Sequence, residues 1–163
     1  MTIRILLTGG TIDKEYDKIH GQLVFTRSHI NQMLEQARCR LDVILESYKL
    51  QDSLAMTHED RLQILEICRA YTEDKIVISH GTDTMIETAR VLADGLSGKT
   101  IALFGAMIPF TFGNSDALFN FGTALAAVQS LPHGVFVTMN GIIFPHDSVR
   151  KNREEGVFEV ITP

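Results

Sequence analysis

The sequence lacks the features that mark several classes of protein. No apolar run approaches the ~20 residues needed to cross a bilayer, and no block of Lys and Arg offers a surface for nucleic acid. The only cysteines, Cys39 and Cys68, do not have the spacing of a metal site, so we expect two reduced thiols. We expect the first strand to begin at Thr2, which leaves no room for a signal peptide. These absences predict a cytoplasmic protein with neither a membrane nor a nucleic-acid partner.

Short motifs for common cofactors and nucleophiles are missing as well. The six histidines are scattered along the chain and do not form a set of metal ligands. No Gly-x-Ser-x-Gly sequence offers a serine nucleophile, and the pair Gly9-Gly10 lacks the Gly-x-Gly-x-x-Gly spacing of a dinucleotide loop. We therefore expect no metal and no cofactor.

What the chain does contain is a regular alternation of strand and helix patterns. Apolar residues make up 45% of its 163 residues, which is enough for the core of a domain of this length. Apolar runs predict strands at 3–7, 41–45, 75–79, 100–104 and 134–139, and weaker signals mark 142–144 and 157–160. Nearly continuous apolar strands are typical of a parallel sheet that is covered on both faces. We expect an α/β fold of one domain over residues 1–163, with a doubly wound, mainly parallel sheet and helices on both faces.

Residues that favour helix N-termini mark where the helices are expected to begin. The expected N-caps are Ser28, Thr57, Thr84 and either Ser115 or Asp116, with Asp60 and Glu87 completing two capping boxes. The first helix is expected to run to about Arg38. The highly charged segment 13–22 precedes that helix, and it is either a lid over a site or an ordinary solvated loop.

Two motifs that contain threonine follow two of the predicted strands. TGGTI occupies residues 8–12, after the strand at 3–7, and HGTDT occupies residues 80–84, after the strand at 75–79. Because the carboxyl ends of parallel strands open into one crevice, we expect the two motifs to meet there. A threonine hydroxyl becomes a nucleophile if a neighbouring group takes its proton and if N–H donors stabilise the oxyanion. The pattern therefore predicts a reaction site with a threonine nucleophile.

Each part of these motifs also has a purely structural explanation. TGGT can be a plain turn, and a capping box accounts for Thr84 and Glu87 without any chemistry. For His80, a structural role at the end of its strand is the favoured interpretation. Lys151, taken alone, is an ordinary surface charge among other charged residues.

Taken together, the motifs resemble those of the bacterial-type L-asparaginases, a family that includes the glutaminase-asparaginases. TGGTI and HGTDT resemble its two signature motifs. The further matches are DSLAMT at 52–57, GAMIP at 105–109, Asp116 with Phe119-Asn120, GVFVTMN at 134–140, and Val149-Arg150-Lys151. The last of these matches the family pattern when the residues after Asn140 are aligned without a gap. The resemblance covers nearly the whole chain. It implies the fold of the family's N-terminal domain, with the second domain of the family absent.

The resemblance also implies roles for individual residues. It implies catalytic roles for Thr11, Tyr16, Thr82, Asp83 and Lys151, and substrate contacts for Gly10, Ser53, Leu54, Thr82, Asp83 and Ala106. Thr11 is the implied nucleophile, with Tyr16 as its partner in the lid. Thr82, Asp83 and Lys151 form a second implied group, in which Lys151 helps to deprotonate Thr82.

Two of the implied contacts concern the charged groups of the substrate. Ser53 would contact its carboxylate, and Asp83 would hold its α-ammonium. Leu54 departs from the family, because longer relatives often have a polar residue at this position. We therefore expect free asparagine to be a poor substrate, or not the substrate.

The implied reaction is the hydrolysis of asparagine or a related small amide to the acid and ammonia. Two alternatives remain open: a non-catalytic protein that binds a small molecule in an asparaginase-like pocket, and an amidase subunit that supplies ammonia to a partner enzyme. We also expect a homo-oligomer, a dimer or a tetramer, with its interface beside the crevice of Thr11 and Thr82. Without it, only the loop that carries Tyr16 would shield the crevice from water.

Overall fold

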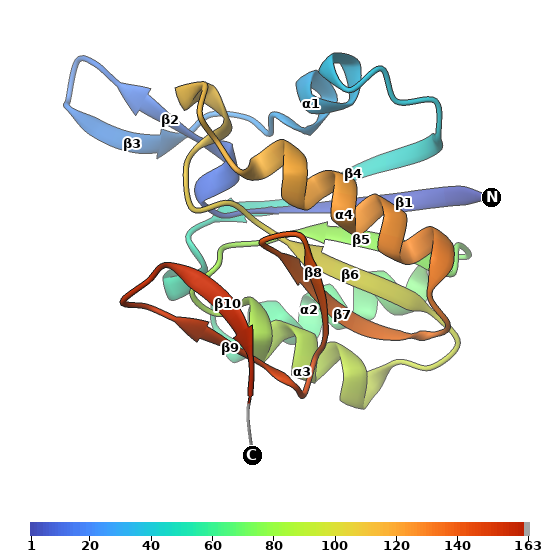
Figure 1. Ribbon diagram of the computed structural model, residues 1–163. Coiled ribbons are helices and arrows are strands. Elements are labelled where there is room, and N and C mark those ends of the chain that lie inside the picture. Colours follow the sequence, from blue (N-terminus) through green and yellow to red (C-terminus); the bar gives the residue numbers. More distant parts are fainter. Residues whose placement is uncertain (162–163) are drawn as a thin grey trace.

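The computed structural model describes residues 1–161, so the last two residues of the expected domain, 162 and 163, lie outside the described residues. Its centre is a six-stranded sheet with the strand order β4-β1-β5-β6-β7-β8 (Figure 1). The strands of this sheet are β1 (Thr2–Gly9), β4 (Asp42–Gln51), β5 (Lys75–Ser79), β6 (Thr100–Phe104), β7 (Gly134–Met139) and β8 (Ile142–Pro145). Neighbouring strands are parallel except for β7 and β8, which are antiparallel. The mainly parallel sheet that the sequence predicted is confirmed.

Helices cover both faces of this sheet. The helices are α1 (Ile30–Gln36), α2 (His58–Ala70), α3 (Met85–Gly95) and α4 (Ala117–Ser130). α2 and α3 pack on one face, and α1 and α4 pack on the other (Figure 1). In β5, Ile76 and Ile78 belong to the first of these two cores, while Val77 belongs to the second. A central strand therefore needs an apolar residue at nearly every position, which is why it appears as a continuous apolar run.

The helix starts agree with the sequence only in part. Thr57 caps α2, and its side chain and that of Asp60 form the expected capping box. The capping box predicted at Thr84 and Glu87 is wrong. Thr84 is the N-cap of α3, but its hydroxyl donates to the carbonyl oxygen of Ser53 at 2.9 Å and does not cap the helix. A tertiary hydrogen bond between two loops has replaced the local one.

The other two helices begin close to the expected residues. α4 begins after Asp116, one of the two expected caps. The N-cap of α1 is His29 and not Ser28, and the helix ends at Gln36. The hydroxyl of Ser28 donates to the buried carboxylate of Asp13 at 2.9 Å, and its oxygen also accepts from the backbone N–H of Ile30, the first residue of α1, at 3.4 Å.

Two small hairpins lie outside the main sheet. β2 (Lys14–Asp17) pairs with β3 (Gln22–Phe25), and β9 (Val149–Asn152) pairs with β10 (Val157–Val160), both in antiparallel fashion. Most of the charged segment 13–22 is therefore a strand and a turn of the β2–β3 hairpin, which projects from the body of the molecule (Figure 1). No helix within residues 1–161 has both the length and the apolar character that a bilayer span needs.

Candidate active site

Glycines allow the loops at the carboxyl ends of four strands to touch one another. A Cβ atom on Gly10 would lie 2.5 Å from the backbone nitrogen of Gly81, so the loops after β1 and β5 are in direct contact. A Cβ atom on Gly81 would lie 2.5 Å from Oγ of Ser53 after β4, and one on Gly105 after β6 would lie 2.4 Å from the carbonyl oxygen of His80. Gly10 also has a φ of 89°, which other residues rarely adopt. The two threonine motifs therefore meet at the end of the sheet.

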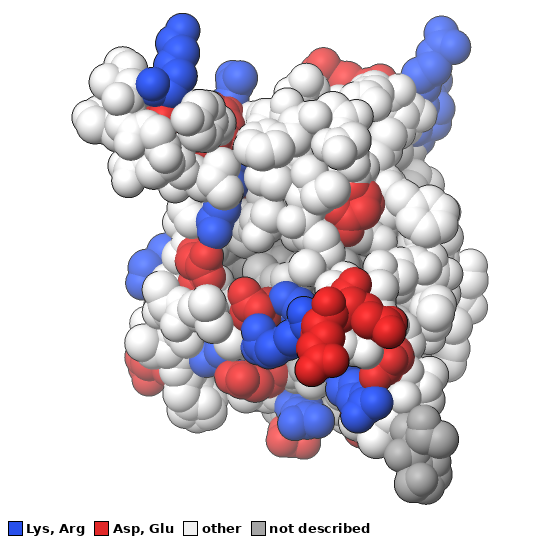
Figure 2. All heavy atoms as spheres, turned by 60° about the vertical axis from the view of Figure 1, so that its left-hand side comes forward, with Lys and Arg blue, Asp and Glu red and all other residues white. Residues whose placement is uncertain are grey.

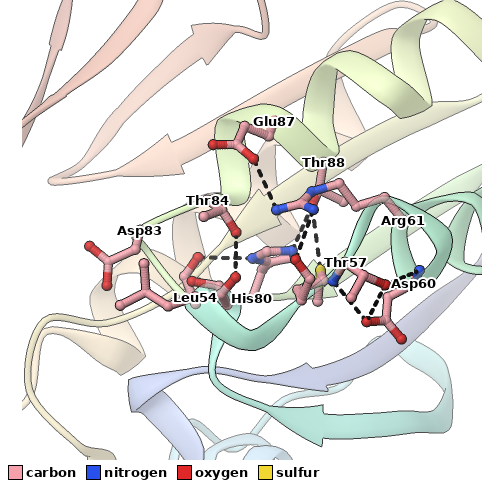
Figure 3. A network of polar contacts seen from close by, with 12 residues as sticks. Leu54, Thr57, Asp60, Arg61, His80, Asp83, Thr84, Glu87 and Thr88 are labelled. Carbon is pink, nitrogen blue, oxygen red and sulfur yellow. Dashed lines mark hydrogen bonds and ion pairs between the residues drawn. The ribbon is translucent and has the colours of Figure 1, made fainter.

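A network of polar contacts supports these loops (Figure 3). The fully buried ring of His80 has its Nδ1 2.8 Å from the carbonyl oxygen of Gly81 and its Nε2 2.8 Å from the hydroxyl of Thr88. Because a carbonyl only accepts, Nδ1 carries the proton and Nε2 accepts from Thr88. The hydrogen bond from Thr84 to Ser53 ties the loop after β5 to the loop after β4. His80 therefore has the structural role that its position favoured.

The buried imidazole of His80 makes the stability of the fold depend on pH. Burial, followed by the nearby charge of Arg61, lowers the pKa of His80 from 6.5 to about 4. Between these values the unfolded chain binds the proton more readily, so the free energy of unfolding falls as the pH drops from 6.5 toward 4. Above pH 6.5 the imidazole is neutral in both the folded and the unfolded chain, so His80 no longer makes the free energy of unfolding depend on pH. We expect a loss of roughly 3 kcal/mol from His80 over this window.

Urea denaturation of the wild type and of His80→Gln across the same pH window measures this effect. The variant should be less stable at neutral pH, and its free energy of unfolding should depend less on pH. The comparison cancels the contributions of other titrating groups. An NMR titration that gave the folded His80 ring an ordinary pKa would contradict the prediction, whether or not the variant folds.

Lys151 on β9 reaches the second threonine motif. Its Nζ donates to Oγ1 of Thr82 at 2.8 Å and to Oδ1 of Asp83 at 2.9 Å. The side chain of Lys151 is only 10% exposed, and Thr82 is buried. The β9–β10 hairpin thus brings together three predicted site residues, although Asp83 and Lys151 are 68 positions apart in the sequence.

A second cation of this cluster is missed by sequence reasoning. Arg153 donates from Nη1 to Oδ1 of Asp83 at 2.6 Å and from Nη2 to the Asp83 carbonyl oxygen at 3.3 Å. Hydrogen bonds from Lys151 and then from Arg153 lower the pKa of Asp83, so its side chain is a carboxylate at neutral pH. Figure 2 shows Lys and Arg side chains lying among Asp and Glu side chains in the middle of the face that is turned toward the viewer. The charged run at 150–155 is typical of a solvated turn, and nothing in its spacing signals that one arginine turns toward the site.

Thr11 and Tyr16, the other predicted pair, have different environments. Thr11 directly follows Gly10 in a 3₁₀ turn (Thr11–Asp13) and is half-buried. Tyr16 is 60% exposed, and its hydroxyl lies 3.9 Å from where a Cβ atom of Gly21 would be, in the turn of the hairpin. Tyr16 lies two residues beyond Lys14 in β2, on the hairpin that projects from the body of the molecule (Figure 1).

Three of the predicted substrate contacts have very different environments. Ser53 is 1% exposed, and within residues 1–161 its Oγ has no hydrogen-bond partner. Leu54 is 68% exposed, whereas Ala106 is fully buried in a core cluster. An unpaired buried hydroxyl is rare in proteins, so Ser53 is the residue here that points most clearly to a polar ligand.

Side chains at the start of α4 hold the loop after β6 in place. The carboxylate of Asp116 accepts from two backbone N–H groups of that loop at 3.0 and 3.1 Å. Asn120 donates to the carbonyl oxygen of Gly105 and accepts from the backbone N–H of Asn140, each at 3.0 Å. These contacts give a physical reason for the motif that contains Asp116 and Asn120, which sequence reasoning could only match to a family pattern.

Comparison with known proteins identifies the family. A family model described as "Asparaginase, N-terminal" matches residues 2–159. The chain belongs to the asparaginase family. L-asparaginase 1 of Escherichia coli is 30% identical to it over 99% of this chain and 51% of that protein. A subunit of the glutamyl-tRNA(Gln) amidotransferase of Methanococcus vannielii is 32% identical over 95% of this chain and 37% of that protein.

Solved structures of asparaginases have the same fold. The thermostable L-asparaginase from Thermococcus kodakarensis superposes with a TM-score of 0.85 at 30% identity, covering 100% of this chain and 52% of that chain. A probable cytoplasmic L-asparaginase from Campylobacter jejuni superposes with a TM-score of 0.80 at 32% identity, over 97% of this chain and 52% of that chain. The chain thus spans about half the length of these asparaginases.

Proposed function

We propose that this asparaginase-family chain is an amidohydrolase with a threonine nucleophile, which converts asparagine or a related small amide to the acid and ammonia. The observation that carries the proposal is the cluster of Lys151, Thr82 and Asp83. The loop that contains Thr82 and Asp83 is in direct contact with the loop that contains Thr11. A hydroxyl nucleophile, a second hydroxyl and a largely buried cation are a set of groups that suits acyl transfer. Several relatives are L-asparaginases, which supports the same reaction.

The proposed reaction has two steps. Thr11 attacks the amide carbon, its hydroxyl proton is transferred to the leaving nitrogen, and ammonia departs to leave an ester on Thr11. Water then attacks the ester, which releases the acid and restores the hydroxyl. Thr82 takes part in the proton transfers, with Lys151 donating to its oxygen. The N-terminus of α3 and the backbone N–H groups beside Gly10 favour the negative charge that develops on the carbonyl oxygen.

One relative favours a second candidate function. The match to part of an amidotransferase supports an alternative in which this chain is an amidase subunit that supplies ammonia within a larger enzyme. Purification of the tagged chain from its native cells would recover a stoichiometric partner protein in that case. The homo-oligomer with an interface beside Thr11 and Thr82 also stays a prediction.

An ammonia-release assay over a panel of small amides tests the proposed function. The panel contains asparagine, glutamine, succinamate and glutaramate, and the protein is made in a host strain without its own asparaginases. We expect ammonia from at least one amide. Thr11→Ala, prepared in the same way, is the matched variant and should release far less ammonia, and a mock purification from the host without the chain measures any contaminating activity. Binding of an amide without release of ammonia would instead identify a non-catalytic binding protein.

A further inference from the structure

The carboxylates at the site are already paired with cations of the chain. Asp83 accepts from both Lys151 and Arg153 through the same oxygen, Oδ1. In the adjacent loop, the carboxylate of Asp52 accepts from Lys14 at 2.6 Å. These five side chains carry three positive charges and two negative charges. The pairing leaves an excess of positive charge where a substrate would bind.

Other acidic residues of this region do not reverse that balance at the cluster. Asp116 has both carboxylate oxygens engaged by N–H donors of its own loop and helix. Glu87 forms an ion pair with Arg61 at 3.0 Å. Glu154 and Glu155 are exposed on the turn of the β9–β10 hairpin, and within residues 1–161 their carboxylates form no ion pair with Lys151 or Arg153. An incoming ammonium would therefore have to share Asp83 with two cations.

A ligand with a carboxylate finds the opposite environment. The Ser53 hydroxyl is buried, has no partner within residues 1–161, and lies against Gly81 at the centre of the four loops. It can donate a hydrogen bond to a carboxylate oxygen. Arg153 is 62% exposed, so its guanidinium is open to an anion from solvent while it remains close to Asp83.

We propose that Arg153 determines the substrate class of this site: amides of dicarboxylic acids that carry a free carboxylate but no α-ammonium, of which succinamate is the simplest. The inference rests on the proposed amide hydrolysis and narrows it. Arg153 donates to Oδ1 of Asp83, so its positive charge lies beside the carboxylate that an α-ammonium would need and repels that group. Asparagine differs from succinamate only by this ammonium, so the two amides isolate the effect of Arg153.

Binding of the corresponding acids tests the inference without any turnover. Succinate and aspartate are titrated into the full chain and followed by NMR chemical shifts. We expect succinate to bind at least about tenfold more tightly than aspartate, a difference of about 1.4 kcal/mol. Arg153→Ala should lower this ratio at least about tenfold, and Arg153→Lys should keep part of it. Arg150→Ala is the matched control, since Arg150 lies on the same hairpin but pairs with Glu159, and it should leave the ratio unchanged.

Several outcomes would overturn the inference. Aspartate binding as tightly as succinate would do so, and so would a loss of affinity for both acids by the same factor in Arg153→Ala, which indicates a merely structural role. A failure of both acids to bind the wild type would also overturn it.

Ammonia release from succinamate and asparagine separates this inference from the proposed function. If neither amide is hydrolysed but the preference for succinate depends on Arg153, the proposed hydrolysis fails and the ligand class stands. If asparagine is hydrolysed faster and Arg153→Ala leaves the ratio of kcat/KM values unchanged, the inference fails and the hydrolysis stands.

Discussion

Replacing Thr11 with alanine is expected to reduce ammonia release on the order of 10³-fold or more, while the fold remains intact. Thr11 lies in the loop that touches the second motif through Gly10 and Gly81, and it is only half-buried, so its side chain supports little of the core. Removal of the hydroxyl takes away the atom that would form the ester. Thr11→Ser keeps a hydroxyl and should retain part of the activity.

The effect on turnover must be separated from an effect on folding. Thr123→Ala is a suitable control, because Thr123 is half-buried like Thr11 and its hydroxyl donates only within α4. Circular dichroism and thermal unfolding of Thr11→Ala should match those of this control. Mass spectrometry after treatment with an electrophilic amide analogue should locate the adduct on Thr11. An adduct on Thr82, or a Thr11→Ala variant with wild-type activity, would show that the nucleophile is assigned to the wrong residue.

The fold could be predicted from the sequence because its strands are buried on both faces. Val77 lies between Ile76 and Ile78, and each of the two cores takes side chains from this strand, so the run is apolar throughout. The meeting of the two threonine motifs could also be predicted, since it depends only on the parallel direction of β1 and β5.

Contacts made by the side chains of turns and hairpins could not be predicted in the same way. Thr84 has the spacing of a capping box with Glu87, but its hydroxyl binds Ser53, a residue that only the folded sheet brings close. Arg153 contacts Asp83 because the β9–β10 hairpin folds back over the start of α3. Tyr16 resembles a lid residue by its position in a charged segment, but nothing in that segment predicts the 60% exposure of its side chain on the β2–β3 hairpin.

Replacement of Lys151 with methionine is expected to lower kcat about 10²- to 10⁴-fold and to change substrate affinity much less. Lys151 donates to the oxygen of Thr82 at 2.8 Å, so its positive charge stabilises that oxygen when the Thr82 proton is transferred. Methionine keeps most of the length and the apolar stem of the side chain, but it removes the charge and the donor. The substitution leaves Asp83 with Arg153 as its partner, so the carboxylate does not become an unpaired charge.

The matched control for Lys151→Met is Arg150→Met, which also removes one positive charge from β9 but at a side chain that is 65% exposed and pairs with Glu159. An exposed ion pair of this kind contributes about 0–1 kcal/mol to stability, so the control should fold and turn over substrate as the wild type does. Steady-state kinetics and ligand titrations of the two variants provide the comparison. If Lys151→Met weakened substrate binding as much as it lowered kcat, or if both variants lost the same activity, Lys151 would act through charge or packing and not in the proton transfer. A loss confined to kcat in Lys151→Met would instead place the lysine at the Thr82 oxygen during the reaction, as the geometry of the cluster indicates.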